Sequence, residues 1–129
     1  MLLDTSGLLA YHSVREPEHK EAVAFFESND RKLTHSYVLA EFVALTHARK
    51  LPQQPAVAFA RALLQHPLVE AIWVGAALHG EALDLLDERS DKAYSLCDAV
   101  SFVLMRRENI SDALTTDHHF QQEQFRRLL

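Results

Sequence analysis

The first twelve residues, MLLDTSGLLAYH (Met1–His12), join a short apolar run to a single acid and then to a second apolar segment. Met1–Leu3 predicts a buried strand, and Thr5–Gly7 turns the chain into a short helix. Asp4 is the only formally charged residue in Met1–Val14. An acid that directly follows a buried strand is expected at the edge of a sheet, where α/β proteins bind their ligands.

Beyond this stretch, short apolar or β-branched segments alternate with longer segments of helical spacing. Such alternation predicts an α/β domain with a short, mainly parallel central sheet. Ser36 is expected to cap one of the helices. Further strands are expected at 32–34, 69–74 and 113–115, an edge strand at 125–129, and helices at 16–28, 36–50, 52–65, 76–89 and 95–107.

Composition narrows the class of protein. The chain has 129 residues, of which 48% are hydrophobic, and this predicts one ordinary domain with a single core. The one cysteine, Cys97, excludes an internal disulfide and favours a reducing cytosol, while no apolar run has the length of a membrane span. The start lacks the basic region of a signal peptide, so a cytoplasmic protein without membrane contact is expected. With a formal charge of −5, no strongly basic face is evident.

Three further acids resemble Asp4 in being isolated within apolar segments. Glu41 stands alone in SYVLAEFVALTHA, Asp98 in SLCDAVSFVLM, and Asp117 in ALTTDHHF. Each could be satisfied separately by a helix cap, an arginine or a backbone N–H. A shared site explains them jointly: clustered carboxylates repel one another, and a divalent cation removes that repulsion. Ligation by oxygen alone suits Mg²⁺ or Mn²⁺.

A site of this kind predicts metal-assisted hydrolysis of a phosphodiester. The cation lowers the pKa of a bound water, which then acts as the nucleophile. A phosphatase that works through a phospho-aspartate is disfavoured, because it needs a second aspartate two residues after Asp4. Ser6 stands at that position.

The four segments MLLDTSGLLAYH, YVLAEFVAL, YSLCDAVSFVLM and ALTTDHHF together resemble the PIN domain, in particular the VapC-type toxin ribonucleases and their relatives. The resemblance covers essentially the whole sequence. It implies one nuclease domain over 1–129 with a Rossmann-like, three-layer α/β/α fold. It also implies a Mg²⁺- or Mn²⁺-dependent endoribonuclease that is the toxin of a type II toxin–antitoxin pair, with RNA as substrate, a small antitoxin as partner, and a homodimer.

The resemblance also assigns roles to particular residues. Two hydroxyl side chains match positions that support the acids, with Ser6 orienting Asp4 and Thr115 orienting Asp117. Cys97 departs from the family pattern, which often has a hydroxyl residue just before its third acid. A catalytically silent PIN-like module that only holds RNA or a partner is the alternative. The catalytic and metal-binding positions are Asp4, Glu41, Asp98 and Asp117.

Several polar neighbours are expected to lie outside the metal site. His118 and His119 follow Asp117 directly, but a hard cation has little use for imidazole. They are expected to begin a helical turn with Phe120 packed beneath it. Asp91 is interpreted as a solvated residue or a cap. The basic pairs are candidates for RNA phosphates or solvated helix ends, namely Arg49–Lys50, Arg106–Arg107 and Arg126–Arg127.

Overall fold

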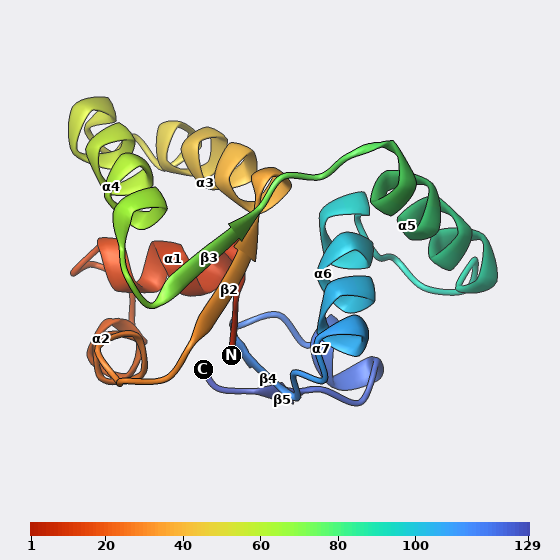
Figure 1. The fold of residues 1–129 in the computed structure, drawn as a ribbon. Helices are drawn as coiled ribbons and strands as arrows, with labels where there is room; N and C mark the ends of the chain where they lie inside the picture. Colours follow the sequence, from red (N-terminus) through yellow and green to blue (C-terminus); the bar gives the residue numbers. More distant parts are fainter.

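The computed structural model describes residues 1–129 and contains a five-stranded sheet in the order β3-β2-β1-β4-β5 (Figure 1). Every neighbouring pair of strands is parallel, which confirms the predicted mainly parallel sheet. The third strand is shorter than expected because the backbone N–H of Val74 donates to Ser36 Oγ at 3.0 Å and not to a strand. The strands are β1 (Leu2–Leu3), β2 (Lys32–His35), β3 (Val69–Ile72), β4 (Asp112–Leu114) and β5 (Arg126–Arg127).

Helices cover both faces of the sheet, in agreement with the predicted three-layer α/β/α fold (Figure 1). Side chains of a strand alternate between its two faces, so even two-residue β1 serves both cores. Leu3 packs in the cluster with the first group of helices, and Leu2 in the cluster with the second. The first group is α1 (Thr5–His12), α2 (His19–Phe26), α3 (Ser36–Ala48) and α4 (Gln53–Gln65); the second is α5 (Ala76–Glu88), α6 (Leu96–Arg107) and α7 (His119–Gln122).

Two helix starts differ from the sequence expectation. The helix expected from residue 16 begins at His19, after a turn in which the His19 N–H donates to the Glu16 carbonyl at 3.1 Å. Ser36 does not cap α3. That role falls to His35, whose Nδ1 accepts from the N–H of Val38 at 3.4 Å. Ser36 is the first residue of α3, and its hydroxyl instead anchors the chain beyond β3.

Gly7 determines how closely α1 approaches the sheet. A Cβ atom at Gly7 would lie 1.9 Å from the carbonyl oxygen of Leu114, which no side chain can tolerate. The first turn of α1 therefore packs directly against the end of β4, and the N–H of Asp4 donates to the same carbonyl at 3.2 Å. This contact places the residues after β1 beside those after β4. Among the helices, none has both the length and the apolar character needed to cross a membrane.

Candidate active site

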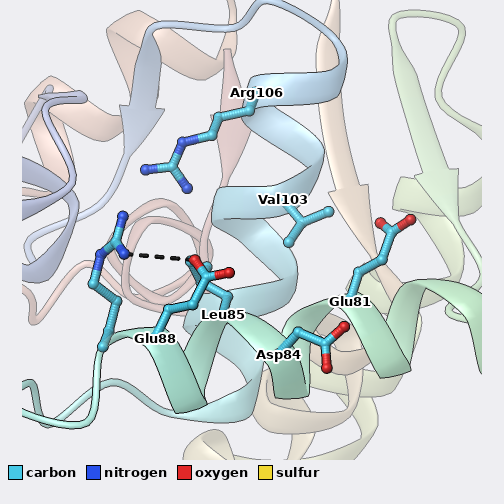
Figure 2. A pocket seen from close by; sticks show the side chains of 7 residues that line it. Glu81, Asp84, Leu85, Glu88, Val103 and Arg106 are labelled. Carbon is cyan, nitrogen blue, oxygen red and sulfur yellow. Dashed lines mark ion pairs between the residues drawn. The ribbon is translucent and has the colours of Figure 1, made fainter.

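A hollow of about 400 Å³ lies between α5 and α6, but it is unrelated to the isolated acids (Figure 2). Its wall carries exposed carboxylates of α5 and Arg106 of α6. None of the acids singled out in the sequence lines it, so it is not the site that the sequence predicts. The lining residues are Glu81, Asp84, Leu85, Glu88, Arg89, Val103 and Arg106.

The isolated acids lie instead at the carboxyl end of the sheet. Asp4 directly follows β1, and Asp117 lies just beyond β4, the strand paired with β1. Asp98 lies in the first turn of α6. Burial is the main cause that raises the pKa of Asp4 and of Asp98; the charge of Asp98 adds to it at Asp4, and the charge of Asp117 adds to it at Asp98. Glu41 lies on an exposed face of α3. Burial raises the pKa of the Cys97 thiol, and the negative charges of Glu41, Asp4 and Asp98 raise it further.

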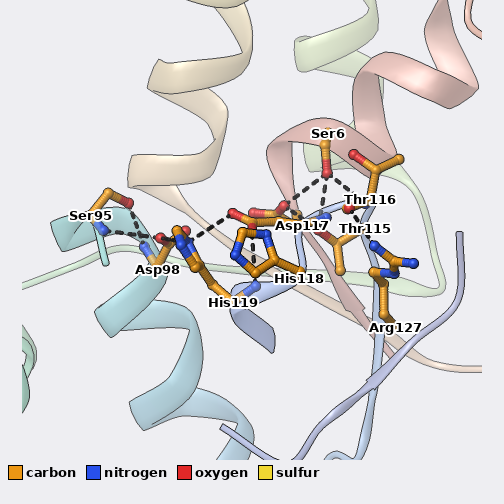
Figure 3. A network of polar contacts seen from close by, with 10 residues as sticks. Ser6, Ser95, Asp98, Thr115, Thr116, Asp117, His118, His119 and Arg127 are labelled. Carbon is orange, nitrogen blue, oxygen red and sulfur yellow. Dashed lines mark hydrogen bonds and ion pairs between the residues drawn. The ribbon is translucent and has the colours of Figure 1, made fainter. Parts of the chain in front are cut away.

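Neutral hydroxyl groups hold the buried Asp4. Its Oδ2 accepts hydrogen bonds from Thr115 Oγ1 at 2.7 Å and from Ser6 Oγ at 3.1 Å. The two hydroxyls are also 3.0 Å apart, which closes a small network across β1 and β4 (Figure 3). Thr115 meets Asp117 only at the backbone, by accepting from its N–H at 3.0 Å. Both hydroxyls thus orient Asp4, whereas the sequence prediction divided them between two acids.

The other two buried or half-buried acids are held by backbone N–H groups. Asp98 Oδ2 accepts from the N–H of Ser95 at 3.0 Å, and Ser95 Oγ accepts in return from the N–H of Asp98. This reciprocal capping box fixes the start of α6. Asp117 Oδ1 accepts from the N–H of His119 at 2.9 Å, at the start of α7. A carboxylate can therefore accept hydrogen bonds from its own segment and still contribute to a shared site.

No arginine or lysine forms an ion pair with any of the four acids. Burial raises the pKa of Asp4 to about 6, even though hydrogen bonds from Thr115, the Thr5 backbone and Ser6 act to lower it. Burial also raises the pKa of Asp98, and the nearby charge of Asp117 adds to the effect. The chain thus gathers carboxylates without an arginine or lysine to neutralise their charge.

His119 enters the site, contrary to the sequence expectation. Its Nδ1 is 3.4 Å from Asp98 Oδ2 and 3.3 Å from Asp117 Oδ2 (Figure 3). That nitrogen is buried and has no hydrogen-bond partner. His118 instead has a side chain that is 66% exposed. The expected helical turn with a buried Phe120 is confirmed.

A carboxylate and two imidazole nitrogens come together around Asp117, a donor set that can hold a divalent cation, whereas Asp4, Glu41 and Asp98 are not part of the same close group. Ligand atoms of Asp117, His118 and His119 lie within 4.8 Å of one another, and the unsatisfied nitrogen of His119 faces two carboxylates. One sequence signal could have identified His119: it lies two residues after Asp117, at the start of a turn that an acid commonly caps. Asp91, by contrast, is exposed and lies 3.7 Å from Lys92 Nζ.

Comparisons with known proteins agree with the observed fold. The family model for the PIN domain matches residues 1–125. Among solved structures, VapC20 of Mycobacterium tuberculosis, described as a sarcin–ricin loop cleaving toxin, is 28% identical in sequence with a TM-score of 0.87. The similarity covers 97% of this chain and 95% of that chain. No curated protein matches the sequence.

Proposed function

Since the chain belongs to the PIN domain family, we propose that it is a metal-dependent endoribonuclease and the toxin of a type II toxin–antitoxin pair. The similarity to VapC20, a toxin that cleaves the sarcin–ricin loop, supports RNA as the substrate. In this proposal residues 1–129 form one cytoplasmic nuclease domain that acts as a homodimer and is held inactive by a small antitoxin.

The observation that carries the proposal is the uncompensated charge at the carboxyl end of the sheet. Asp4 and Asp98 are buried, yet no arginine or lysine pairs with them, and only His119 Nδ1 lies near Asp98, at 3.4 Å. Removing one partner from a buried ion pair costs several kcal/mol, so folds rarely leave buried acids without a cation. A divalent cation from solution explains why these acids are tolerated here.

The roles proposed for the chain's own residues follow from their contacts. Asp4, Asp98 and Asp117 provide carboxylate oxygens whose orientation is fixed by hydroxyl or backbone donors. Glu41 makes no hydrogen bond or ion pair, so its side chain is free to rotate toward the cation or a bound water. When bound, Mg²⁺ or Mn²⁺ supplies an activated water and offsets the charge of the scissile phosphate.

RNA cleavage by matched variants tests the proposal. An RNA hairpin with the sarcin–ricin loop sequence and total RNA are incubated with the protein and Mg²⁺ or Mn²⁺, with and without chelator. Asp4→Asn should lower cleavage by about a thousandfold, because a metal ion contributes several kcal/mol to the transition state. Asp91→Asn is the control, because it makes the same chemical change at a solvated acid.

Each outcome has a distinct meaning. Equal cleavage by wild type and Asp4→Asn would contradict the proposed chemistry. RNA binding that survives Asp4→Asn, without cleavage and without metal uptake by calorimetry, would identify a silent binding module instead. If the chain is a toxin, induced expression of the wild type should arrest growth, and expression of Asp4→Asn should not. Sequencing the new RNA ends then locates the cut.

A further inference from the structure

Most arginines of the chain are neutralised by carboxylates, and this makes the exceptions informative. The sequence contains nine arginines. Six of them form ion pairs with acids of the chain, namely Arg31, Arg49, Arg89, Arg106, Arg107 and Arg126. Among the remaining three, only Arg127 makes a hydrogen bond to the loop that carries Asp117.

The position of Arg127 follows from the register of the edge strand. In the pairing of β4 with β5, Arg127 lies opposite Ala113, and the N–H of Leu129 donates to the carbonyl of Thr115 at 3.3 Å. One guanidinium nitrogen of Arg127 donates to the carbonyl of Thr116 at 3.0 Å. Thr116 lies between Thr115, which holds Asp4, and Asp117 (Figure 3). The cationic group is therefore held beside the candidate metal site without a carboxylate partner.

The neighbouring arginine shows the opposite arrangement. Arg126 donates from Nε and from a terminal nitrogen to the two carboxylate oxygens of Asp112. Because successive residues of a strand point to opposite faces, Arg126 and Arg127 cannot act as a pair. Of the two adjacent arginines, Arg126 is therefore neutralised by a carboxylate, and Arg127 remains available to bind an anion.

We infer that Arg127 binds a backbone phosphate of the RNA strand at the candidate site, an assignment that rests on the proposed nuclease function. A guanidinium carries five N–H donors, and one of them is used by Thr116. The remaining donors can hold phosphate oxygens in a bidentate manner. RNA approaching four acids meets repulsion, and one unpaired cation at the edge of the site offsets it without neutralising the acids themselves.

The test compares two variants with the same change of charge. Arg127→Gln removes the cation but keeps an amide that can donate to the Thr116 carbonyl. Arg126→Gln is the control, because it lowers the net charge equally at the adjacent residue. Binding of a fluorescent sarcin–ricin loop hairpin is measured by anisotropy between 50 and 200 mM salt, with Asp4→Asn in every protein to keep the RNA intact.

Arg127→Gln should raise the Kd for the hairpin by about tenfold, as expected for a charge-assisted hydrogen bond. It should also reduce the slope of log affinity against log salt by about 0.7 to 0.9. Arg126→Gln should leave that slope unchanged, and Arg127→Lys should restore most of it. An arginine that only steadies the loop would instead alter the melting temperature or the Mn²⁺ affinity without changing the salt slope.

Equal salt slopes for Arg127→Gln and Arg126→Gln would overturn the assignment. Failure of the proposed function is detected separately, by testing whether the protein with Asp4 intact cleaves the same hairpin. If it cleaves and the slopes are equal, only the role of Arg127 is wrong. If it does not cleave, the nuclease proposal fails, and a reduced slope would still identify Arg127 as a phosphate-binding residue.

Discussion

Two buried acids, Glu123 and Asp4, have opposite electrostatic surroundings in this chain. The side chain of Glu123 is 4% exposed and accepts from Arg89 Nε at 2.8 Å, from a terminal nitrogen of Arg106, and from the Tyr94 hydroxyl at 3.1 Å. Burial alone would raise its pKa, but hydrogen bonds from the two arginines and Tyr94 hold that pKa below its ordinary value. Asp4 receives only hydroxyl and backbone donors, and its pKa is raised to about 6.

The fold thus provides positive charge beside one buried acid, Glu123, and provides none beside Asp4 at the end of β1. The Glu123 cluster joins α5, α6 and the segment after α7, so its cations come from the chain and serve stability. The Asp4 cluster, formed by Asp4, Ser6 and Thr115, contains orienting hydroxyl groups but no charge of opposite sign. We therefore expect the first cluster to respond to mutation through stability, and the second through metal and RNA.

Glu123→Gln gives the largest expected change in stability. It should lower the free energy of unfolding by about 3 kcal/mol, the lower end for a broken buried ion pair, because the two arginines keep partial contact with water. Chemical denaturation at pH 7 measures the effect. RNA cleavage per folded molecule should stay unchanged.

Glu88→Gln is the matched control, because that acid is exposed and contacts Arg89 only at 3.7 Å. It should change the free energy of unfolding by less than about 1 kcal/mol. Comparable losses in the two variants would show that the buried cluster contributes no more than surface charge. The contrast with the Asp4 cluster would then have no energetic basis.

The pH dependence of stability should have opposite signs for the two clusters. In the metal-free protein, folded Asp4 binds its proton more tightly than the unfolded chain does, because its pKa is about 6 and not about 4. Its ionisation therefore destabilises the fold as the pH rises from about 4 through 6, by up to about 3 kcal/mol. Glu123 has a lowered pKa, so its contribution is present near neutral pH and is lost only on acidification below its unfolded pKa.

The difference between wild type and Asp4→Asn isolates this effect. Buried His35, with a pKa lowered to about 4 by burial, adds a slope of opposite sign over the same range, and it cancels in the difference. With chelator present, Asp4→Asn should match the wild type near pH 4 and become progressively more stable up to pH 7. A difference that is constant with pH would show that Asp4 is not held at a raised pKa. Mn²⁺ should stabilise only the wild type.

The layers of the fold and the position of Asp4 could be predicted because both depend on local pattern. An acid after the apolar run at Leu2–Leu3 is visible in the sequence, and alternating strands and helices allow few topologies. Glu123 shows no such signal, because it lies in the polar segment QQEQ and its arginine partners lie directly after α5 and in α6. An acid that is isolated in an apolar segment can be recognised in the sequence, whereas an acid paired with distant arginines can be recognised only in the structure.

Contacts between distant segments explain the other differences. The need for glycine at Gly7 depends on the Leu114 carbonyl, and His119 lies beside Asp98, which is more than twenty residues earlier in the chain. The distinction between Arg126 and Arg127 depends on strand register, which places Asp112 beside only one of them. Composition and spacing contain no direct information on any of these pairings.

Thr115→Val gives the smallest expected effect and tests how the Asp4 cluster is oriented. The change removes a hydroxyl that donates to Asp4 and accepts from the N–H of Asp117, while nearly keeping the volume. Loss of such a supporting contact should weaken Mn²⁺ binding about tenfold. Thr34→Val is the control, because it removes another buried hydroxyl, which donates to the Leu3 carbonyl at 3.1 Å. Calorimetric titration should show weaker Mn²⁺ binding for Thr115→Val alone. Equal Mn²⁺ affinities would mean that Ser6 suffices to orient Asp4, and that Thr115 contributes to folding in the same way as Thr34.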